Sequence, residues 1–182
     1  MLGGTVELVA LRDDAGVAKI RAAVGSLLFL AIAPGMVAGL VPWLITGWSV
    51  HEWFLPVRVL GVALIAAGLA FLLPAFVRFV FEGIGTPAPV APTERLVVGG
   101  AYRYVRNPMY LAVAAVIVGQ TLFLGQAILL LYAVGFGVAV TAFVLGYEEP
   151  TLVSRFGEEY DFYRSAVPRW LPRPSPWRRG LP

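Results

Sequence analysis

Two stretches of the sequence bring together residue types that could do chemistry. The first, "GGAYRYVRNPMYL" at residues 99–111, contains three tyrosines, two arginines and an Asn-Pro step. The second, "YEEPTLVSRFGEEYDFYRS", begins at residue 147 and carries the adjacent carboxylates Glu148 and Glu149. Guanidinium groups bind carboxylates, tyrosine faces attract cations, and a glutamate can accept a proton. The two stretches predict either a polar pocket for a ligand or an ion-pair network that anchors one stretch to the other.

The composition around these stretches is that of a membrane protein. Of the 182 residues, 59% are hydrophobic and 14% are charged, whereas roughly a quarter of the residues in soluble domains are charged. Long uncharged runs are the direct signal of membrane-spanning helices. The chain has no cysteine and a single histidine, His51, so thiolate sites and a zinc site built from several histidines are excluded. We expect no metal and no nucleic-acid partner.

The fold class that we expect is all-α, a polytopic integral membrane protein with about four transmembrane helices. Pro34 and Pro42 are expected to kink the first span, which neighbouring helices in a bundle can tolerate. Residues 109–147 contain no charge and are too long for one span, and Gly125 offers the turn between two spans. We treat residues 1–182 as a single membrane domain with spans at 24–45, 57–81, 109–124 and 127–147.

The basic residues predict the orientation of these spans. Thirteen of the fourteen Lys and Arg residues fall on one side of the four-span arrangement, and Arg58 alone falls on the other. Basic residues favour the cytoplasmic side, so both termini and the active site are expected there. Residues 1–23 are expected to form a short interfacial helix. The cytoplasmic segments 82–108 and 148–172 hold the candidate site residues.

The C-terminal segment predicts a bend followed by an interfacial helix. Pro150 disfavours the α conformation at Glu149 and suits the first turn of a new helix, so we expect the chain to bend at the glutamate pair. Four residues recur at spacings of four and three, which predicts one apolar and aromatic stripe along a single helix. That helix would lie on the membrane surface or cover the loop. The stripe consists of Leu152, Phe156, Tyr160 and Tyr163.

Both polar stretches resemble one family of membrane enzymes. "LVVGGAYRYVRNPMYL" and "EEPTLVSRFGEEYDFYRSAVPRWLP" resemble the isoprenylcysteine carboxyl methyltransferase family, which is similar to the phospholipid amine methyltransferases, over roughly residues 94–172. The resemblance implies S-adenosylmethionine bound in a helical pocket closed by the tail, and a lipid or prenylated acceptor that enters from the bilayer. "VVGGA" is not the GxGxxG motif of a dinucleotide-binding fold. Carried over to this sequence, the cofactor-binding residues would be Glu94, Arg95, Leu96, Val97, Tyr102, Asn107, Pro108, Met109, Tyr110 and Glu148.

The chemistry of methyl transfer suggests catalytic roles for two residues. We expect Glu149 to act as the base for an amine acceptor and Arg106 to act as an orienting charge, while Arg103 or Arg106 could pair with the cofactor's carboxylate. The isoprenylcysteine enzymes typically have a histidine where this chain has Asn107, which cannot titrate. Those of eukaryotes have an arginine, suited to an acidic acceptor, where this chain has Val144. The missing arginine favours the amine headgroup of a phospholipid as the acceptor.

Three alternative functions remain open at this point. The first is carboxyl O-methylation of an isoprenylcysteine-like substrate. The second is an NADPH-dependent enzyme similar to the membrane sterol reductases, which nucleotide-dependent thermal stabilisation would distinguish. The third is a non-enzymatic membrane scaffold or transporter, which would bind neither cofactor.

Overall fold

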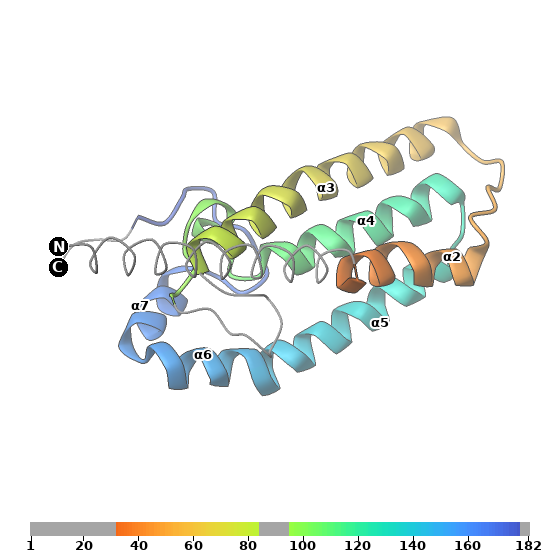
Figure 1. Cartoon of the computed structure of the whole chain (residues 1–182). Coiled ribbons are helices and arrows are strands. Elements are labelled where there is room, and N and C mark those ends of the chain that lie inside the picture. Colours follow the sequence, from red (N-terminus) through yellow and green to blue (C-terminus); the bar gives the residue numbers. More distant parts are fainter. Residues whose placement is uncertain (1–31, 84–94, 179–182) are drawn as a thin grey trace, which may run out of the picture.

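The structure is a computed structural model that describes residues 32–83 and 95–178. Within these ranges it is helical throughout and contains no strand, which confirms the expected all-α class. The long helices run along a common direction, and the polar loop, α6, α7 and the tail gather at one end of them (Figure 1). In chain order the elements are η1 (Met36–Leu40), α2 (Val41–Thr46), α3 (Leu55–Gly83), η2 (Gly100–Arg103), α4 (Pro108–Leu124), α5 (Ile128–Phe143), η3 (Val144–Glu148), α6 (Glu149–Phe156) and α7 (Glu158–Ala166).

Two helices of the described residues are long and apolar enough to cross a membrane. They are Leu55–Arg78, with 24 residues, and Ile128–Phe156, with 29 residues. At 1.5 Å per residue even the shorter one extends about 36 Å, against a hydrocarbon core of about 30 Å. Ile32–Thr46 and Pro108–Leu124 are shorter apolar helices. The expected interfacial helix at 1–23, the first residues of span 24–45 and Glu94 lie outside the described residues.

Glycines allow α3 and α4 to pack with their backbones in close contact. A Cβ atom added to Gly61 would lie 2.7 Å from the Gly119 carbonyl oxygen, and one added to Gly119 would lie 2.8 Å from the Gly61 carbonyl oxygen. A Cβ on Gly68 would similarly meet the Ala112 carbonyl oxygen at 2.8 Å. Small residues that permit such an approach are the usual means of helix association in a bilayer. The α3–α4 pair is therefore closely packed at these glycines.

The expected kink at Pro42 takes the form of a π-turn, η1. Proline has no N–H group, so the carbonyls four and five residues before Pro42 lose a helical donor. Both carbonyls receive a side-chain hydrogen bond from another helix. Gln120 Nε2 donates to the Ala38 carbonyl at 2.6 Å, and the Tyr132 hydroxyl donates to the Val37 carbonyl at 2.8 Å. These bonds fasten the first helix to α4 and α5.

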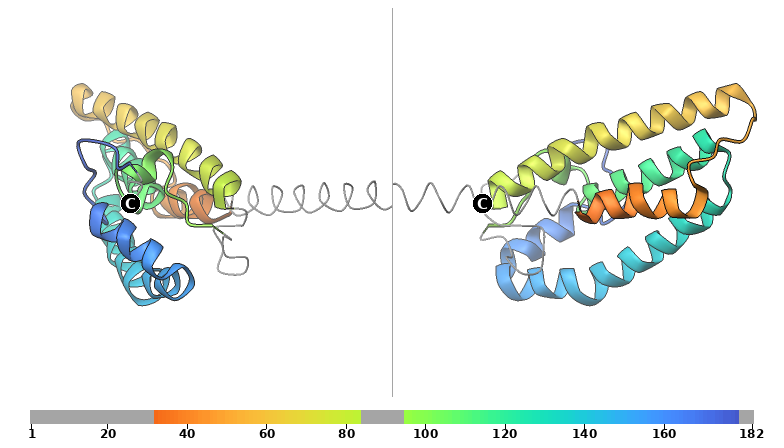
Figure 2. Two further views of the ribbon diagram at one scale, coloured as in Figure 1. Left: turned by 90° about the vertical axis from the view of Figure 1, so that its left-hand side faces the viewer. Right: turned by 45° about the vertical axis from the view of Figure 1, so that its right-hand side comes forward.

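The expectation that Glu149 avoids the α conformation is wrong. Glu149 has α-helical dihedral angles, with φ −63° and ψ −45°, so the helix continues from α5 through η3 into α6. The π-turn η3 directly precedes this position, and the helix continues although Pro150 has no N–H group to donate to the preceding turn. The chain nevertheless changes direction here, because α6 lies at an angle to α5 in both Figure 1 and the right view of Figure 2.

The single C-terminal helix expected from the aromatic stripe is also wrong, because α6 and α7 are separate helices. Gly157 lies between them with φ +51° and ψ −125°, a conformation that glycine adopts far more readily than other residues. All four stripe residues still join one cluster, in which Tyr160 and Tyr163 are buried against Val167 and Trp177. Leu96 and Val98 of the loop pack on the same cluster. The two helices therefore cover the loop.

Candidate functional site

The candidate site lies where the loop, the tail and the junction of η3 with α6 meet. The loop and the tail are joined by three backbone hydrogen bonds of 2.8–2.9 Å, and the Asn107 side-chain amide adds a fourth bond, to the Arg169 carbonyl, at 3.2 Å. The tail is thus held against the loop along several residues. The backbone N–H groups of Arg106, Arg173 and Trp177 donate to the carbonyls of Pro168, Tyr104 and Arg103, respectively.

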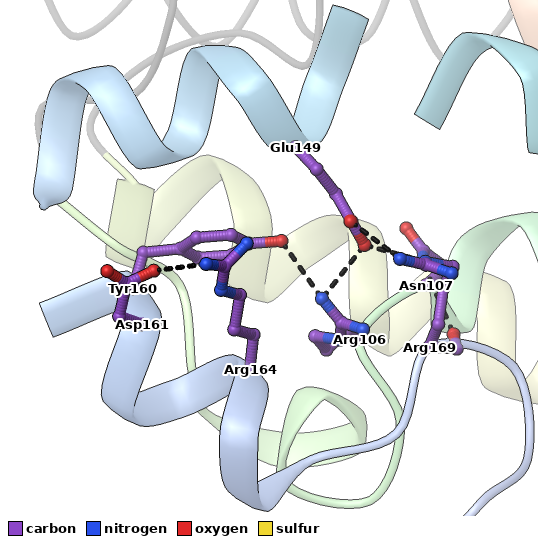
Figure 3. A network of polar contacts seen from close by, with 7 residues as sticks. All are labelled: Arg106, Asn107, Glu149, Tyr160, Asp161, Arg164 and Arg169. Atoms are coloured by element: carbon purple, nitrogen blue, oxygen red, sulfur yellow. Dashed lines mark hydrogen bonds and ion pairs between the residues drawn. The ribbon is translucent and has the colours of Figure 1, made fainter. Parts of the chain in front are cut away.

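Glu149 is the centre of an ion-pair network that Figure 3 shows from close by. Arg169 binds it with two hydrogen bonds of 2.7 Å, from Nε to Oε1 and from Nη2 to Oε2. Arg106 Nη1 donates to Glu149 Oε1 at 2.8 Å and to the Tyr160 hydroxyl at 3.2 Å. The side chains of Arg106 and Glu149 are each only 11% exposed. The ion-pair network, one of the two alternatives that the sequence left open, is present, and Glu149 is its acceptor.

Hydrogen bonds and burial favour one protonation state at Glu149, at Arg169 and at two tyrosines of the site. Two guanidinium groups on one carboxylate stabilise the ionised form of Glu149. In return, the hydrogen bond to Glu149 raises the pKa of Arg169 above its ordinary value. Burial raises the pKa of Tyr160 and Tyr163, so both hydroxyls stay protonated near neutral pH. Tyr163 uses its proton to donate to the Tyr102 carbonyl at 2.6 Å.

Glu148 belongs to a different environment from its neighbour. Consecutive helical residues point in directions about 100° apart, and Glu148 faces α4, where the Tyr110 hydroxyl donates to its Oε2 at 3.0 Å. Tyr110 is the one described side chain that hydrogen-bonds to Glu148. The second oxygen of Glu148 therefore retains its capacity to accept a hydrogen bond or a proton.

The network carries an excess of positive charge that is not fully satisfied. Arg106 and Arg169 contribute two positive charges against the single negative charge of Glu149. The Nε atom of Arg106 is buried and has no hydrogen-bond partner among the described residues. A buried guanidinium N–H group without a hydrogen-bond acceptor destabilises the fold, and an anionic ligand could supply that acceptor. Arg103 is less available, because its Nε donates to the Trp177 carbonyl at 2.7 Å.

The other residues that were expected to bind the cofactor do not form a single cluster in the structure. Val97 and Tyr102 are buried with Ala75 of α3, and Met109 packs against them. Leu96 packs against the aromatic cluster of α7 and the tail instead. Pro108 is buried at the start of α4 and Arg95 is exposed. The buried members of this set lie where α3, the loop and the first turn of α4 meet. Among the described residues of the expected cofactor set, Tyr110 is the one with a hydrogen bond to Glu148.

Two residues of the network were not among the expected site residues. Arg169 was counted only as a basic residue of the tail, and Tyr160 only as a member of the aromatic stripe. Arg169 and Tyr160 lie 63 and 54 positions after Arg106 in the sequence. They reach Arg106 and Glu149 only because the C-terminal segment folds back onto the loop. The sequence feature that could have identified them is that both residues lie within the second stretch that resembles the family.

The comparisons with known proteins agree with the resemblance in the sequence. The sequence model of the phospholipid methyltransferase family matches residues 56–159, more than half of the chain, and the chain belongs to this family. An uncharacterized protein of Haemophilus influenzae is 36% identical over 63 residues, which are 35% of this chain and 100% of that relative. No solved structure matches the chain. The family match spans Arg106, Tyr110 and both glutamates, and ends before Tyr160 and Arg169.

Proposed function

We propose that this member of the phospholipid methyltransferase family transfers methyl groups from S-adenosylmethionine to the amine headgroup of a membrane phospholipid. The observation that supports the proposal is that two adjacent carboxylates have different partners. Glu149 is bound by two guanidinium groups, whereas the Tyr110 hydroxyl is the one described hydrogen-bond partner of Glu148. The site would lie at the cytoplasmic end of four spans, at 24–45, 57–81, 109–124 and 127–147.

The residues at the junction fit S-adenosylmethionine by charge. The unpartnered Nε of Arg106 and the positive excess around Glu149 suit the cofactor's carboxylate. Glu148 and Tyr110 offer a carboxylate and an aromatic face to its cationic part. When bound, the cofactor supplies an electrophilic methyl group, whose carbon–sulfur bond breaks with the electron pair left on sulfur as the acceptor nitrogen bonds to carbon. The chain's own residues bind the cofactor and the acceptor, orient them, and accept the proton that the acceptor loses.

The proton of the acceptor defines the role of Glu148. A lipid amine is protonated near neutral pH and must lose one proton before its nitrogen can accept a methyl group. Both oxygens of Glu149 are occupied by Arg106 and Arg169, so accepting a proton there would cost the ion pairs. We therefore assign the base to Glu148, and replace the expectation that Glu149 is the base. Arg106 keeps its proposed role as an orienting charge.

The position of Val144 supports an amine acceptor over a carboxylate. Val144 is 1% exposed and lies in η3, one turn before the glutamate pair. A buried valine provides no charge to balance an acidic acceptor, whereas Glu148 provides the charge that a cationic amine requires. O-methylation of an isoprenylcysteine carboxylate is therefore the less favoured alternative.

The test is the activity of Glu148→Gln in lipid nanodiscs that contain phosphatidylethanolamine. Glutamine keeps the shape of the side chain but accepts no proton, so we expect kcat to fall by about 100-fold or more. Glu158→Gln, which changes an exposed glutamate of α7, serves as the matched control and should keep wild-type activity. Wild-type kcat in Glu148→Gln would overturn the assignment of the base. Absence of N-methylated lipid with the wild-type protein would overturn the proposed function.

A further inference from the structure

Arg58 is an isolated positive charge at the end of the bundle opposite the candidate site. It lies in the first turn of α3, which begins at the end away from the polar loop and the tail (Figure 1). The adjoining segments, residues 47–54 and 125–127, contain no arginine or lysine. The guanidinium carbon of Arg58 lies 5.4 Å from the centre of the Phe123 ring on α4. The aromatic ring therefore covers one side of the cation.

The hydrogen-bonding capacity of Arg58 is not used within the described parts of the chain. Its Nε atom is buried and has no hydrogen-bond partner among the described residues. The carboxylate of Glu52, six positions earlier, is exposed, and none of the ion pairs between described residues includes Arg58. A buried guanidinium N–H group without an acceptor destabilises the fold, and an anionic ligand could supply that acceptor.

The surface beside Arg58 is open to lipid. Leu55 and Val62, three positions before and four positions after Arg58, share its side of α3, and both are exposed. Gly61 lies on the α4 side of Arg58, because a Cβ added to it would lie 2.6 Å from the backbone nitrogen of Phe123. Arg58 is therefore at the edge of the α3–α4 contact, where a molecule in the bilayer can reach its guanidinium group.

The position of Arg58 along α3 matches the level of lipid phosphates. The apolar helix Leu55–Arg78 extends about 36 Å, so a centred hydrocarbon core of about 30 Å leaves about 3 Å at each end. The Cα atom of Arg58 is about 4.5 Å from the start of the helix, close to this boundary. Helical side chains lean towards the N-terminus, here the nearer membrane surface, and long arginine side chains extend their charge to that surface.

We propose that Arg58 binds the phosphate of a phospholipid whose acyl chains lie against the exposed apolar side of α3. The phosphate oxygens would accept the free N–H groups and balance the charge. Inorganic phosphate has the same oxygens, but only a lipid also covers Leu55 and Val62. The inference does not depend on the proposed methyl transfer, because the candidate site for that reaction is at the other end of the bundle.

Photo-crosslinking of the full-length protein in detergent tests the proposal at the site itself. The probe is phosphatidylglycerol with a diazirine in one acyl chain, and the readout is saturable labelling of residues 53–62, measured by mass spectrometry of peptides. Arg58→Met keeps an apolar side chain over the Phe123 ring and removes the charge and the N–H groups. We expect the lipid concentration for half-saturation to rise about tenfold in this variant.

Arg155→Met provides the matched control. The guanidinium carbon of Arg155 also lies near an aromatic ring, 5.9 Å from the centre of Phe156, but Arg155 is exposed and lies on α6 at the other end of the bundle. This variant should keep the wild-type half-saturation. Arg58→Lys keeps the charge without the planar fork of the guanidinium, so its half-saturation should lie between those of the wild type and Arg58→Met.

Two measurements on the wild-type protein remain decisive even if a variant fails to fold. Diacylglycerol with the same diazirine chain lacks the phosphate and should need about tenfold more lipid for half-saturation. Inorganic phosphate should not compete with phosphatidylglycerol, whereas unlabelled phosphatidylglycerol should. Equal labelling by the two lipids, competition by inorganic phosphate, or an unchanged half-saturation in folded Arg58→Met would overturn the inference.

Discussion

At the scale of single residues, neighbouring glutamates have the same chemistry and different partners. Glu149 points to the loop and the tail, where Arg106 and Arg169 hold it as an ionised carboxylate. Glu148 points to α4, where one tyrosine hydroxyl contacts it. A carboxylate with two guanidinium partners is a good structural acceptor and a poor base, while one with a single neutral partner can still take a proton. The helix geometry of η3 and α6 separates the two roles.

Arg169 is expected to stabilise the closed arrangement of the tail. Arg169→Met removes two hydrogen bonds to a carboxylate that is largely buried, so the free energy of unfolding should fall by about 1–3 kcal/mol. Thermal unfolding in detergent measures this change. Arg164→Met removes an exposed ion pair with Asp161, which contributes at most about 1 kcal/mol, and is the matched control. Equal shifts in melting temperature for the two variants would contradict the structural role of Arg169.

At the scale of elements, glycine and proline determine how the helices pack and turn. Glycines let α3 and α4 approach to backbone contact. Pro42 and Pro150 each follow a π-turn, because a proline removes a helical donor and the wider turn accommodates its absence. At η1 the freed carbonyls are bound by Gln120 and Tyr132. The same type of turn at η3 ends at Glu148, and Glu149 begins α6.

The glycine contacts predict a difference between two alanine substitutions. A Cβ on Gly119 would lie 2.8 Å from a backbone carbonyl oxygen, so α3 and α4 would have to separate, and we expect Gly119→Ala to destabilise the protein by about 1–3 kcal/mol. Gly135→Ala has no atom within 4 Å of the added Cβ and should be neutral or stabilising by up to about 1 kcal/mol. Thermal unfolding of both variants under the same conditions provides the comparison. A smaller effect at Gly119 than at Gly135 would contradict the packing.

The sequence was sufficient to predict some of these elements and not others. The helical class follows from uncharged runs, which only a helix or a closed barrel can accommodate in a bilayer. The break at Gly157 could not be inferred, because the stripe from Leu152 to Tyr163 fits one continuous helix equally well. The continuation through Glu149 was missed because the rule for residues before proline is a conformational preference, to which helices that contain a proline are the exception. Arg169 joins the site only through the fold of the tail.

At the scale of the whole molecule, charge and apolar surface occupy different regions. Large apolar side chains of α3 and α5 face outward, including Phe71, Leu131 and Val138. Such a surface is unfavourable in water and suited to lipid. The arginines of the loop, α6, α7 and the tail gather at the opposite end from the connection between α2 and α3 (Figure 1). The distribution supports the proposal that this end is cytoplasmic.

The orientation is testable because the chain contains no cysteine. Single cysteines can be introduced at two exposed positions, Glu52→Cys between α2 and α3 and Ser175→Cys in the tail. In intact cells, a membrane-impermeant maleimide should label Glu52→Cys and leave Ser175→Cys unlabelled until the membrane is permeabilised. Labelling of Ser175→Cys from outside, with Glu52→Cys protected, would contradict the proposed sidedness.

The central claim, methyl transfer to a lipid amine, is tested most directly by the chemical stability of the product. The wild-type protein is incubated with radiolabelled S-adenosylmethionine, phosphatidylethanolamine and a prenylcysteine analogue, and the lipid extract is then treated with mild base. N-methyl groups survive this treatment, whereas methyl esters release volatile methanol. The account predicts that the label stays with the headgroup. Label released as methanol would show a carboxylate acceptor and contradict the account.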